Sequence, residues 1–534
     1  MYQNKQSTDF DTRGKQAHPV DVYGNPVPMA APVAHTGNAS NGAVAPMKPT
    51  ASAPSGFRDW PFAILFVLNI GAIIVLLVMY GTTLLKKSDG TTSSKTFSNV
   101  ISDSNMKTVL AVSGALSVIA AALSFVMLSL TVRFARMMIQ VSLWFSVVLC
   151  FASCAFAAVK GQYVLAAVCG LIGLLSVCYA YAVQDRIPFA VANLRAAGAA
   201  IRKHPSTYLV AFLFLIIQIV WVFAWSISVV GISNKLTETT DSSVSTGTLA
   251  IGRTCSSNAV CASNNCVNRQ CSEANTFSQL KGSSYAAYFF LLVSLYWGVQ
   301  VFSNIIHATV AGTVATWWFS QDSKGATGAS LGRATTTSLG SICLGSLIVA
   351  VLQALRTLAQ EARSQGDWLA CIAECILNCL QSLMEVFNRW AFVYVGIYGY
   401  KFTDAGRAVM TLFQSRGFDA IINDDLISNA LGFASFGVGC LCALLGLAYN
   451  YINTANQFQY SEIIFPFIGL FFGIGISLVP LGVVDSAVAT VYVCFAEDPV
   501  ALQHSHTEHY NELMTEWHRK YPEIMVASGY YVVA

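Results

Sequence analysis

Ten long apolar stretches constrain the fold of this chain more than any other feature of its sequence. Each is at least about as long as the ~20 residues that a helix needs to cross the core of a bilayer. They occupy residues 61–85, 109–130, 137–159, 163–183, 207–232, 285–319, 339–358, 387–410, 426–448 and 462–495. The sequence therefore predicts an all-α polytopic membrane protein with about ten transmembrane helices.

The charged residues are too few for the alternative, a chain of several soluble domains. Only 11% of the 534 residues are Asp, Glu, Lys or Arg, against about 25% in an ordinary soluble domain. The formal net charge of +3 is also too small to indicate a nucleic-acid partner. The lipid bilayer is the expected surrounding of the chain, and a soluble enzyme is effectively excluded.

Positive charges in the short loops predict the orientation of the helices. Arg133 and Arg136 lie close to helix ends, in a loop that is inside if the N-terminal tail is inside. An even number of spans then places both termini in the cytosol. We expect a disordered N-terminal tail, because it is polar and rich in Pro, Ala, Ser and Gly. The predicted divisions are a cytosolic tail, a ten-helix transmembrane domain and a second cytosolic tail, at residues 1–56, 57–498 and 499–534.

One hydrophilic loop, residues 233–284, holds four closely spaced cysteines. They are Cys255, Cys261, Cys266 and Cys271. Such a set forms either two disulfides or a metal site, and the spacing lacks the C-x2-C unit of most structural zinc sites. We therefore predict disulfides, in any of three pairings, and no metal. Disulfides persist in oxidising compartments, and the helix count independently places this loop outside.

The stretch at residues 359–386 is neither a loop nor a clear span. It carries several charged residues, and Cys371, Cys375 and Cys379 recur every four residues. That spacing places the three thiols on one helical face, where packing is a simpler role than metal binding. We predict a short amphipathic or re-entrant helix on the outer side.

The chain lacks the motifs of the common membrane and soluble enzymes. It has no Walker-A string, no HExxH and no kinase signature. His504, His506 and His509 follow the last span, where a solvated helix is a simpler interpretation than a metal site. The pattern favours a secondary transporter without a cofactor. The alternative is a non-transporting membrane scaffold, which would need no ionisable groups inside its spans.

Ionisable residues inside membrane spans are costly, so each is a candidate for function. Asp485 lies in the tenth stretch, five residues after Pro480, and His307 lies in the sixth. Both are candidates for proton coupling, and Asp485 also for binding the substrate; the alternative for each is a hydrogen bond within the helix bundle. Glu385 and Arg389, four residues apart, are expected to pair with each other.

Aromatic residues cluster in the fifth and sixth stretches. Trp221 and Trp225 share a helical face, and Tyr296 and Trp297 lie deeper than an interfacial belt would place them. Aromatic faces bind quaternary ammonium groups by cation–π attraction. These four residues are therefore candidates for substrate binding, with core packing as the alternative.

Several strings of residues, taken in order, resemble the choline transporter-like family, solute carrier family 44. They are Phe57-Arg58-Asp59-Trp60-Pro61-Phe62, Ala311-Gly312-Thr313-Val314-Ala315-Thr316-Trp317-Trp318, Gly340-Ser341-Ile342-Cys343-Leu344-Gly345, Asn388-Arg389-Trp390-Ala391-Phe392, Val484-Asp485-Ser486 and Cys494-Phe495-Ala496-Glu497-Asp498. The likeness runs from about Phe57 to Asp498. The short first outer loop, 86–108, makes the chain similar to the shorter fungal and protist members.

The resemblance implies ten helices with both termini in the cytosol, which agrees with the count of apolar stretches. It also implies transport of choline or a related small organic cation, by facilitated diffusion or by proton exchange, most simply in the plasma membrane. It provides no binding residues to carry over and no protein partner.

Overall fold

The computed structural model describes most of the hydrophobic chain. The described residues are 56–81, 103–241, 253–256, 260–261, 266–267, 269–271, 282–364, 368–416, 419–453, 460–520 and 522. The predicted N-terminal tail therefore lies almost entirely outside the described residues.

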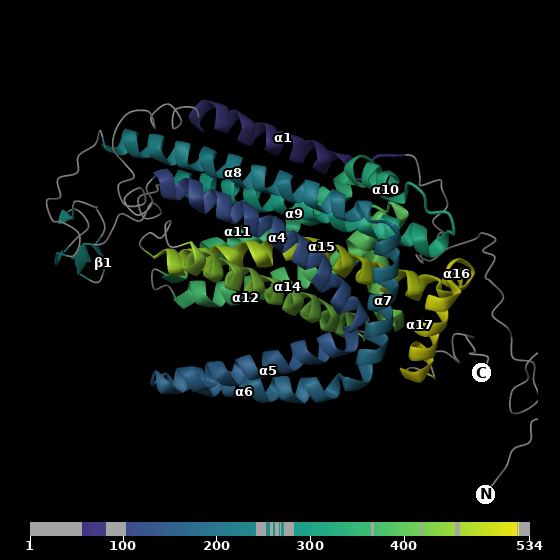
Figure 1. Ribbon diagram of the computed structural model, residues 1–534. Helices are drawn as coiled ribbons and strands as arrows, with labels where there is room; N and C mark the ends of the chain where they lie inside the picture. The colour runs from purple at the N-terminus through teal and green to yellow at the C-terminus, as the bar shows by residue number, and fades with distance from the viewer. Residues whose placement is uncertain are drawn as a thin grey trace, which may run out of the picture.

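Ten helices in the described part of the chain are long and apolar enough to cross a membrane, which confirms the predicted fold class. Figure 1 shows the long helices running side by side along one common direction. The helices that contain these spans are α1 (Trp60–Leu76, continued by the π-helical turn η1, Leu77–Gly81), α4 (Asp103–Arg133), α5 (Ala135–Val159), α6 (Tyr163–Ala182), α8 (Ser206–Asp241), α9 (Gly282–Phe319), α11 (Leu339–Ser364), α12 (Trp368–Tyr398), α14 (Asp419–Ile452) and α15 (Ser461–Glu497).

The structure corrects the predicted position of the eighth span. Helix α12 is continuous from Trp368 to Tyr398, so the span does not begin at 387, and 359–386 does not form a separate re-entrant helix. Polar residues in the first half of α12 lower its local hydropathy, yet they pair with α11. Arg363 of α11, for example, forms an ion pair of 2.6 Å with Glu374 of α12.

Close packing of α14 against α15 depends on glycine. A Cβ atom on Gly469 would meet the backbone of Cys442, and one on Gly473 would meet the backbone of Gly439. The small residues let the two helices approach at backbone distance, as in other membrane bundles. This contact anchors α15 despite its two internal prolines, Pro466 and Pro480.

One end of the bundle is covered by shorter helices that the sequence did not predict. Helix α7 (Ile187–Lys203) crosses this end, and α16 (Pro499–Ser505) and α17 (Thr507–Lys520) lie beside it (Figure 1). Residues 499–520, predicted only as a tail, are thus folded onto the bundle. Three further short elements are η2 (Gln184–Arg186), α10 (Ala326–Thr335) and α13 (Phe402–Arg416).

The cysteine-containing loop lies at the opposite end from α16 and α17 (Figure 1). Its two short strands, β1 (Cys266–Val267) and β2 (Gln270–Cys271), pair antiparallel.

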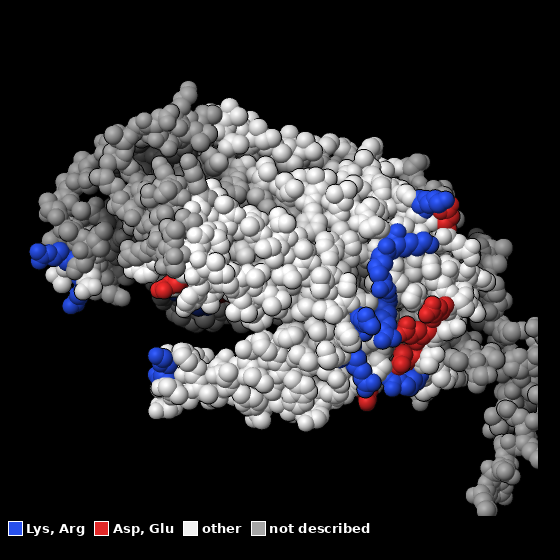
Figure 2. All heavy atoms as spheres, viewed as in Figure 1, with Lys and Arg blue, Asp and Glu red and all other residues white. Residues whose placement is uncertain are grey.

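Figure 2 shows that the described charged residues on the visible face of the molecule gather toward the two ends, with a broad band between them that is almost free of charge. That distribution matches a multi-pass membrane protein.

Candidate functional site

A cavity of about 710 Å³ lies inside the bundle, between α8, α9, α11, α12 and α15. Half of the residues that line it are polar or ionisable, which is unusual for the interior of a membrane-spanning bundle. The polar ones are Gln218, Gln300, Ser303, Asn304, His307, Glu385, Asn388, Arg389, Asp485 and Ser486.

The cavity contains both ionisable residues that the sequence singled out. Asp485 lies on its wall with about a quarter of its side chain exposed, and its Oδ2 forms an ion pair of 2.8 Å with Nη1 of Arg389. The Ser428 hydroxyl donates to Asp485 Oδ1 at 2.6 Å. The second guanidinium nitrogen of Arg389 also donates to the Asp485 backbone carbonyl at 3.2 Å.

His307 is connected to the same arginine through the backbone. Its Nε2 lies 2.8 Å from the carbonyl oxygen of Arg389, and its Nδ1 lies 2.8 Å from the hydroxyl of Ser486. Because a carbonyl oxygen only accepts, Nε2 carries a proton. In the neutral ring Nδ1 then accepts from the Ser486 hydroxyl. His307 and Asp485 are therefore neighbours in one network, although their roles in proton coupling remain predictions.

Arg389 thus pairs with Asp485 of another helix. The expected ion pair between Glu385 and Arg389 does not occur among the described residues. Glu385 instead accepts from the amide of Gln381 at 2.7 Å and from that of Gln353 at 3.3 Å. Two carboxylates and one guanidinium line the cavity, so its formal charge is −1 with His307 neutral. A cavity of this sign attracts a cation.

The four candidate aromatic residues do not line this cavity. Trp297 is 4% exposed, packs edge-on against Phe66, and donates from Nε1 to the carbonyl of Cys343 at 2.9 Å. The Tyr296 hydroxyl lies 2.9 Å from that of Thr357. The hydrogen bonds to Cys343 and Thr357 connect α9 to α11.

The two tryptophans of α8 pack against α9. Trp221 donates to the carbonyl of Leu295 at 3.3 Å, and Trp225 donates to that of Leu291 at 2.9 Å. Gly298 leaves room for the Trp221 ring, which a Cβ atom would meet. These geometries give Trp221, Trp225, Tyr296 and Trp297 contacts between helices, and their role in substrate binding remains a prediction.

At the end of the bundle nearest α16 and α17, called the sealed end, aromatic residues that do not line the cavity are packed and buried. Trp390 and Tyr492 lie there with ring centroids 6.2 Å apart. The Tyr394 hydroxyl donates to Glu497 at 2.7 Å, and Trp318 Nε1 donates to the backbone carbonyl of Asp498 at 3.0 Å. Glu385, by contrast, is exposed and lies nearer the opposite end of the cavity along α12.

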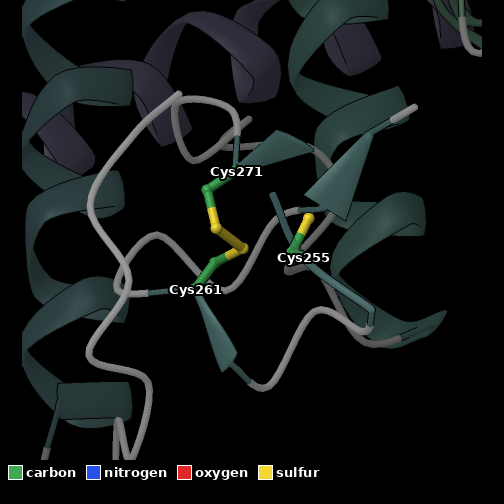
Figure 3. A group of neighbouring side chains, drawn as sticks. All are labelled: Cys255, Cys261 and Cys271. Carbon is green, nitrogen blue, oxygen red and sulfur yellow. A yellow bond between two sulfur atoms is a disulfide. The ribbon is translucent and has the colours of Figure 1, made fainter. Parts of the chain in front are cut away.

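The cysteine loop contains the predicted disulfide chemistry. Cys261 and Cys271 are joined by a disulfide, shown in Figure 3, with their Cα atoms 5.5 Å apart. The Cys255 sulfur lies within 4.8 Å of both, and Cys255 is itself disulfide-bonded. Because disulfide sulfurs are not thiolates, this trio does not provide a metal site. The Cys266 side chain lies outside the described residues.

Sequence analysis did not identify the uncharged amides that line the cavity, such as Asn304 and Asn388. Asn304 donates to the Ser346 hydroxyl at 2.9 Å, and Asn388 donates to the carbonyl of Gly345 at 2.8 Å. Asn388 does lie in one of the strings quoted above, next to Arg389. Both residues are uncharged amides within apolar stretches, and this feature could have identified them, because such groups also need hydrogen-bond partners in a membrane.

Comparison with known proteins places these features in a family. The family described as "Plasma-membrane choline transporter" matches residues 167–500. The chain is 30% identical to Protein PNS1 of Mycosarcoma maydis, over 76% of this chain and 72% of that protein. It is also 30% identical to Protein PNS1 of Cryptococcus neoformans, where the match covers 69% of this chain and 65% of that protein.

A third relative extends the match along the chain. A CTL-like protein of Dictyostelium discoideum is 26% identical over 88% of this chain and 77% of its own length. The family match includes Arg389, Asp485 and the other residues of the cavity network. The chain therefore belongs to the choline transporter-like family.

Proposed function

We propose that this protein carries choline, or a closely related small organic cation, across the plasma membrane. The observation that supports the proposal most directly is the polar cavity with a net negative charge, enclosed by five spanning helices. Its volume lies within the range of small-molecule sites. Membership of the choline transporter-like family favours choline over other cations of this size.

The ion pair between Arg389 and Asp485 supplies a mechanism for binding and release. A substrate cation that reaches Asp485 competes with the guanidinium of Arg389 for the same carboxylate. A proton competes too, because a protonated Asp485 no longer attracts either cation. Competition of a proton and the substrate for one carboxylate yields proton exchange. If Asp485 does not titrate during the cycle, the same cavity supports facilitated diffusion.

His307 is placed to transmit the state of this carboxylate. Its ring binds the backbone of Arg389 and the hydroxyl of Ser486, which follows Asp485 in the chain. A change in the Arg389–Asp485 pair therefore moves groups that hold the imidazole. Protonation of the ring would turn Nδ1 into a donor and require the Ser486 hydroxyl to rotate and accept.

Transport requires the sealed end of the bundle to open. We assign this end to the cytosol, together with α7, α16, α17 and both termini. The disulfide loop at the other end is then outside, where its disulfides are stable. In this orientation the conformation described is closed toward the cytosol. Opening would separate the Tyr394–Glu497 and Trp318–Asp498 contacts.

Uptake of labelled choline into vesicles that contain the purified protein tests the proposal. We expect saturable uptake that unlabelled choline inhibits, and we expect an imposed proton gradient to accelerate it if exchange operates. Vesicles with the double variant Arg389→Ala, Asp485→Ala serve as the matched control. Uptake that is no faster than in empty vesicles would favour a non-transporting membrane scaffold.

A further inference from the structure

Glu385 differs from the other carboxylate of the cavity in its partners. Asp485 is held by Arg389 and by Ser428. Glu385 is exposed, lines the same cavity, and forms no ion pair with any lysine or arginine in the part of the chain that the structure describes. A carboxylate within a spanning helix, without a cationic partner there, is costly unless it meets water or a cation from outside.

Its orientation is fixed by neutral amides. Gln381 donates from Nε2 to Glu385 Oε1 at 2.7 Å, one helical turn earlier on α12, and Gln353 of α11 donates to the same oxygen at 3.3 Å. Both amides donate to the same oxygen, Oε1. The second oxygen, Oε2, accepts no hydrogen bond from the described residues, so it is available to a ligand.

A cationic side chain of α11, Arg356, contacts Gln381 but does not form an ion pair with Glu385. Arg356 of α11 donates from Nη1 to Gln381 Oε1 at 3.0 Å and to Asn378 Oδ1 at 2.9 Å. Because the Gln381 oxygen accepts from Arg356, its amide nitrogen must point toward Glu385. The hydrogen bonds from Arg356 to Gln381 and from Gln381 to Glu385 thus hold the carboxylate in place. Arg356 itself does not touch the carboxylate.

The position of Glu385 along α12 determines when a cation that enters the cavity would meet it. It lies four residues before Arg389 on α12, and therefore about one turn farther from the sealed end. A cation that enters from the unsealed end would meet Glu385 before it meets the Arg389–Asp485 pair.

We infer that Glu385 is the carboxylate that binds the positive charge of the substrate on entry, with Gln381 and Arg356 as its positioning residues. The ligand class is a small monovalent organic cation, recognised by charge rather than by hydrogen bonds from its cationic group. This inference rests on the proposed function, because it names the first binding residue of the same cavity. It divides the two carboxylates by role: Glu385 receives the cation, and Asp485 exchanges it with Arg389.

The test compares choline with its uncharged analogue, 3,3-dimethylbutan-1-ol, in which carbon replaces the quaternary nitrogen. Binding of each to the purified full-length protein is measured by competition with labelled choline. We expect the wild-type protein to prefer choline and the Glu385→Gln variant to lose about tenfold in that preference, as for a charge pair of moderate strength. Glu385→Asp keeps the charge and should keep most of the preference.

Two further variants separate binding of charge from general damage. Glu374→Gln removes a carboxylate from the same helix that lies outside the cavity and pairs with Arg363, and it should leave the preference unchanged. Gln381→Leu should weaken choline binding but not binding of the uncharged analogue, whereas a structural defect would weaken both. If Glu385→Gln cannot be purified, the Gln381→Leu comparison decides.

The outcomes separate this inference from the proposed function. If wild-type protein prefers choline and Glu385→Gln keeps the full preference, the assignment of Glu385 is overturned and the transport proposal survives. If wild-type protein binds both compounds equally or neither at all, cation transport itself is overturned, and the role of Glu385 with it.

Discussion

Arg389 and Asp485 lie on different helices, α12 and α15, and their side chains form an ion pair of 2.8 Å on the wall of the central cavity. Both are only about a quarter exposed. Breaking a partly buried pair by removing one partner is costlier than losing a surface pair, because the remaining charge is poorly solvated. A competing ion could exchange partners with this pair at lower cost, and the transport role proposed for the pair rests on this property.

We expect Asp485→Asn to abolish the response of choline uptake to an imposed pH gradient. Asparagine has nearly the size of aspartate and can still accept from Ser428, but it does not titrate. The measurement is uptake into vesicles at several internal and external pH values. Asp404→Asn is a suitable control, because Asp404 pairs with the exposed Arg407 outside the spans. An unchanged pH response in Asp485→Asn would make Asp485 a structural residue.

The disulfide loop provides a test of orientation. We expect Cys255, Cys261 and Cys271 to resist a membrane-impermeant maleimide on intact cells until a reductant is added, because they are disulfide-bonded. A variant with alanine at these three positions and at Cys266, the fourth cysteine of the predicted disulfides, gives the background from the other cysteines. Labelling without reductant would contradict the disulfides in the cellular protein. Protection after reduction and unfolding on intact cells would contradict the outside placement.

The spanning helices could be predicted from sequence because length and hydropathy are local properties. Nine of the ten predicted stretches overlap their helices closely, as 163–183 does with α6. The eighth was misplaced because the polar residues of α12, such as Gln381 and Glu385, are satisfied by α11. The mean hydropathy of a sequence window treats these side chains as unfavourable in a membrane. Only the tertiary structure shows the hydrogen-bond partners that satisfy them.

The site was predictable only in part. The cost of charge in lipid identified Asp485 and His307, and both lie in the cavity. The sequence could not show that the string containing Arg389 meets the string containing Asp485. Four-residue spacing placed Trp221 and Trp225 on one face, but it did not show that this face packs on the backbone of α9. Which helix a given helical face packs against depends on contacts between residues that are far apart in the sequence.

Trp297 allows the two interpretations of the aromatic residues to be separated. Its ring is buried against Phe66 and its Nε1 donates to Cys343. From this packing we expect Trp297→Ala to lower the free energy of unfolding by about 3–5 kcal/mol, as for other large-to-small core substitutions. The measurement is thermal unfolding in detergent, with choline binding as the second readout.

A cation–π role for Trp297 predicts a different result. Loss of a desolvated cation–π contact costs about 2 kcal/mol, or ~30-fold in choline affinity, and Trp297→Phe would retain part of it. The packing geometry predicts that the choline affinity of folded Trp297→Phe stays near that of the wild type. A large loss of affinity for choline alone, without loss of stability, would restore Trp297 to the binding site.

The attachment of α16 and α17 should weaken in acid. His506 packs against Trp317 of α9, with ring centroids 4.1 Å apart. Burial, and then the positive charge of Lys203 and the neighbouring His509, lower the pKa of His506 to about 4, from 6.5 in the unfolded chain. Between these values the detached chain binds a proton that the packed ring does not. The stabilisation is therefore complete above pH 6.5 and is lost as the pH falls toward 4.

Hydrogen exchange of the α17 amides between pH 7.5 and pH 5, corrected for the intrinsic pH dependence of exchange, measures this effect. We expect protection to fall with pH in the wild-type protein, and to fall much less in His506→Phe, which keeps an aromatic ring against Trp317 but cannot titrate. His204, which hydrogen-bonds Ser323 at the same end and whose pKa burial also lowers, should account for the remainder. His504→Gln, at an exposed position on α16, is the control and should behave as the wild type. If His506→Phe loses protection as steeply as the wild type, His506 does not set the pH dependence of this contact.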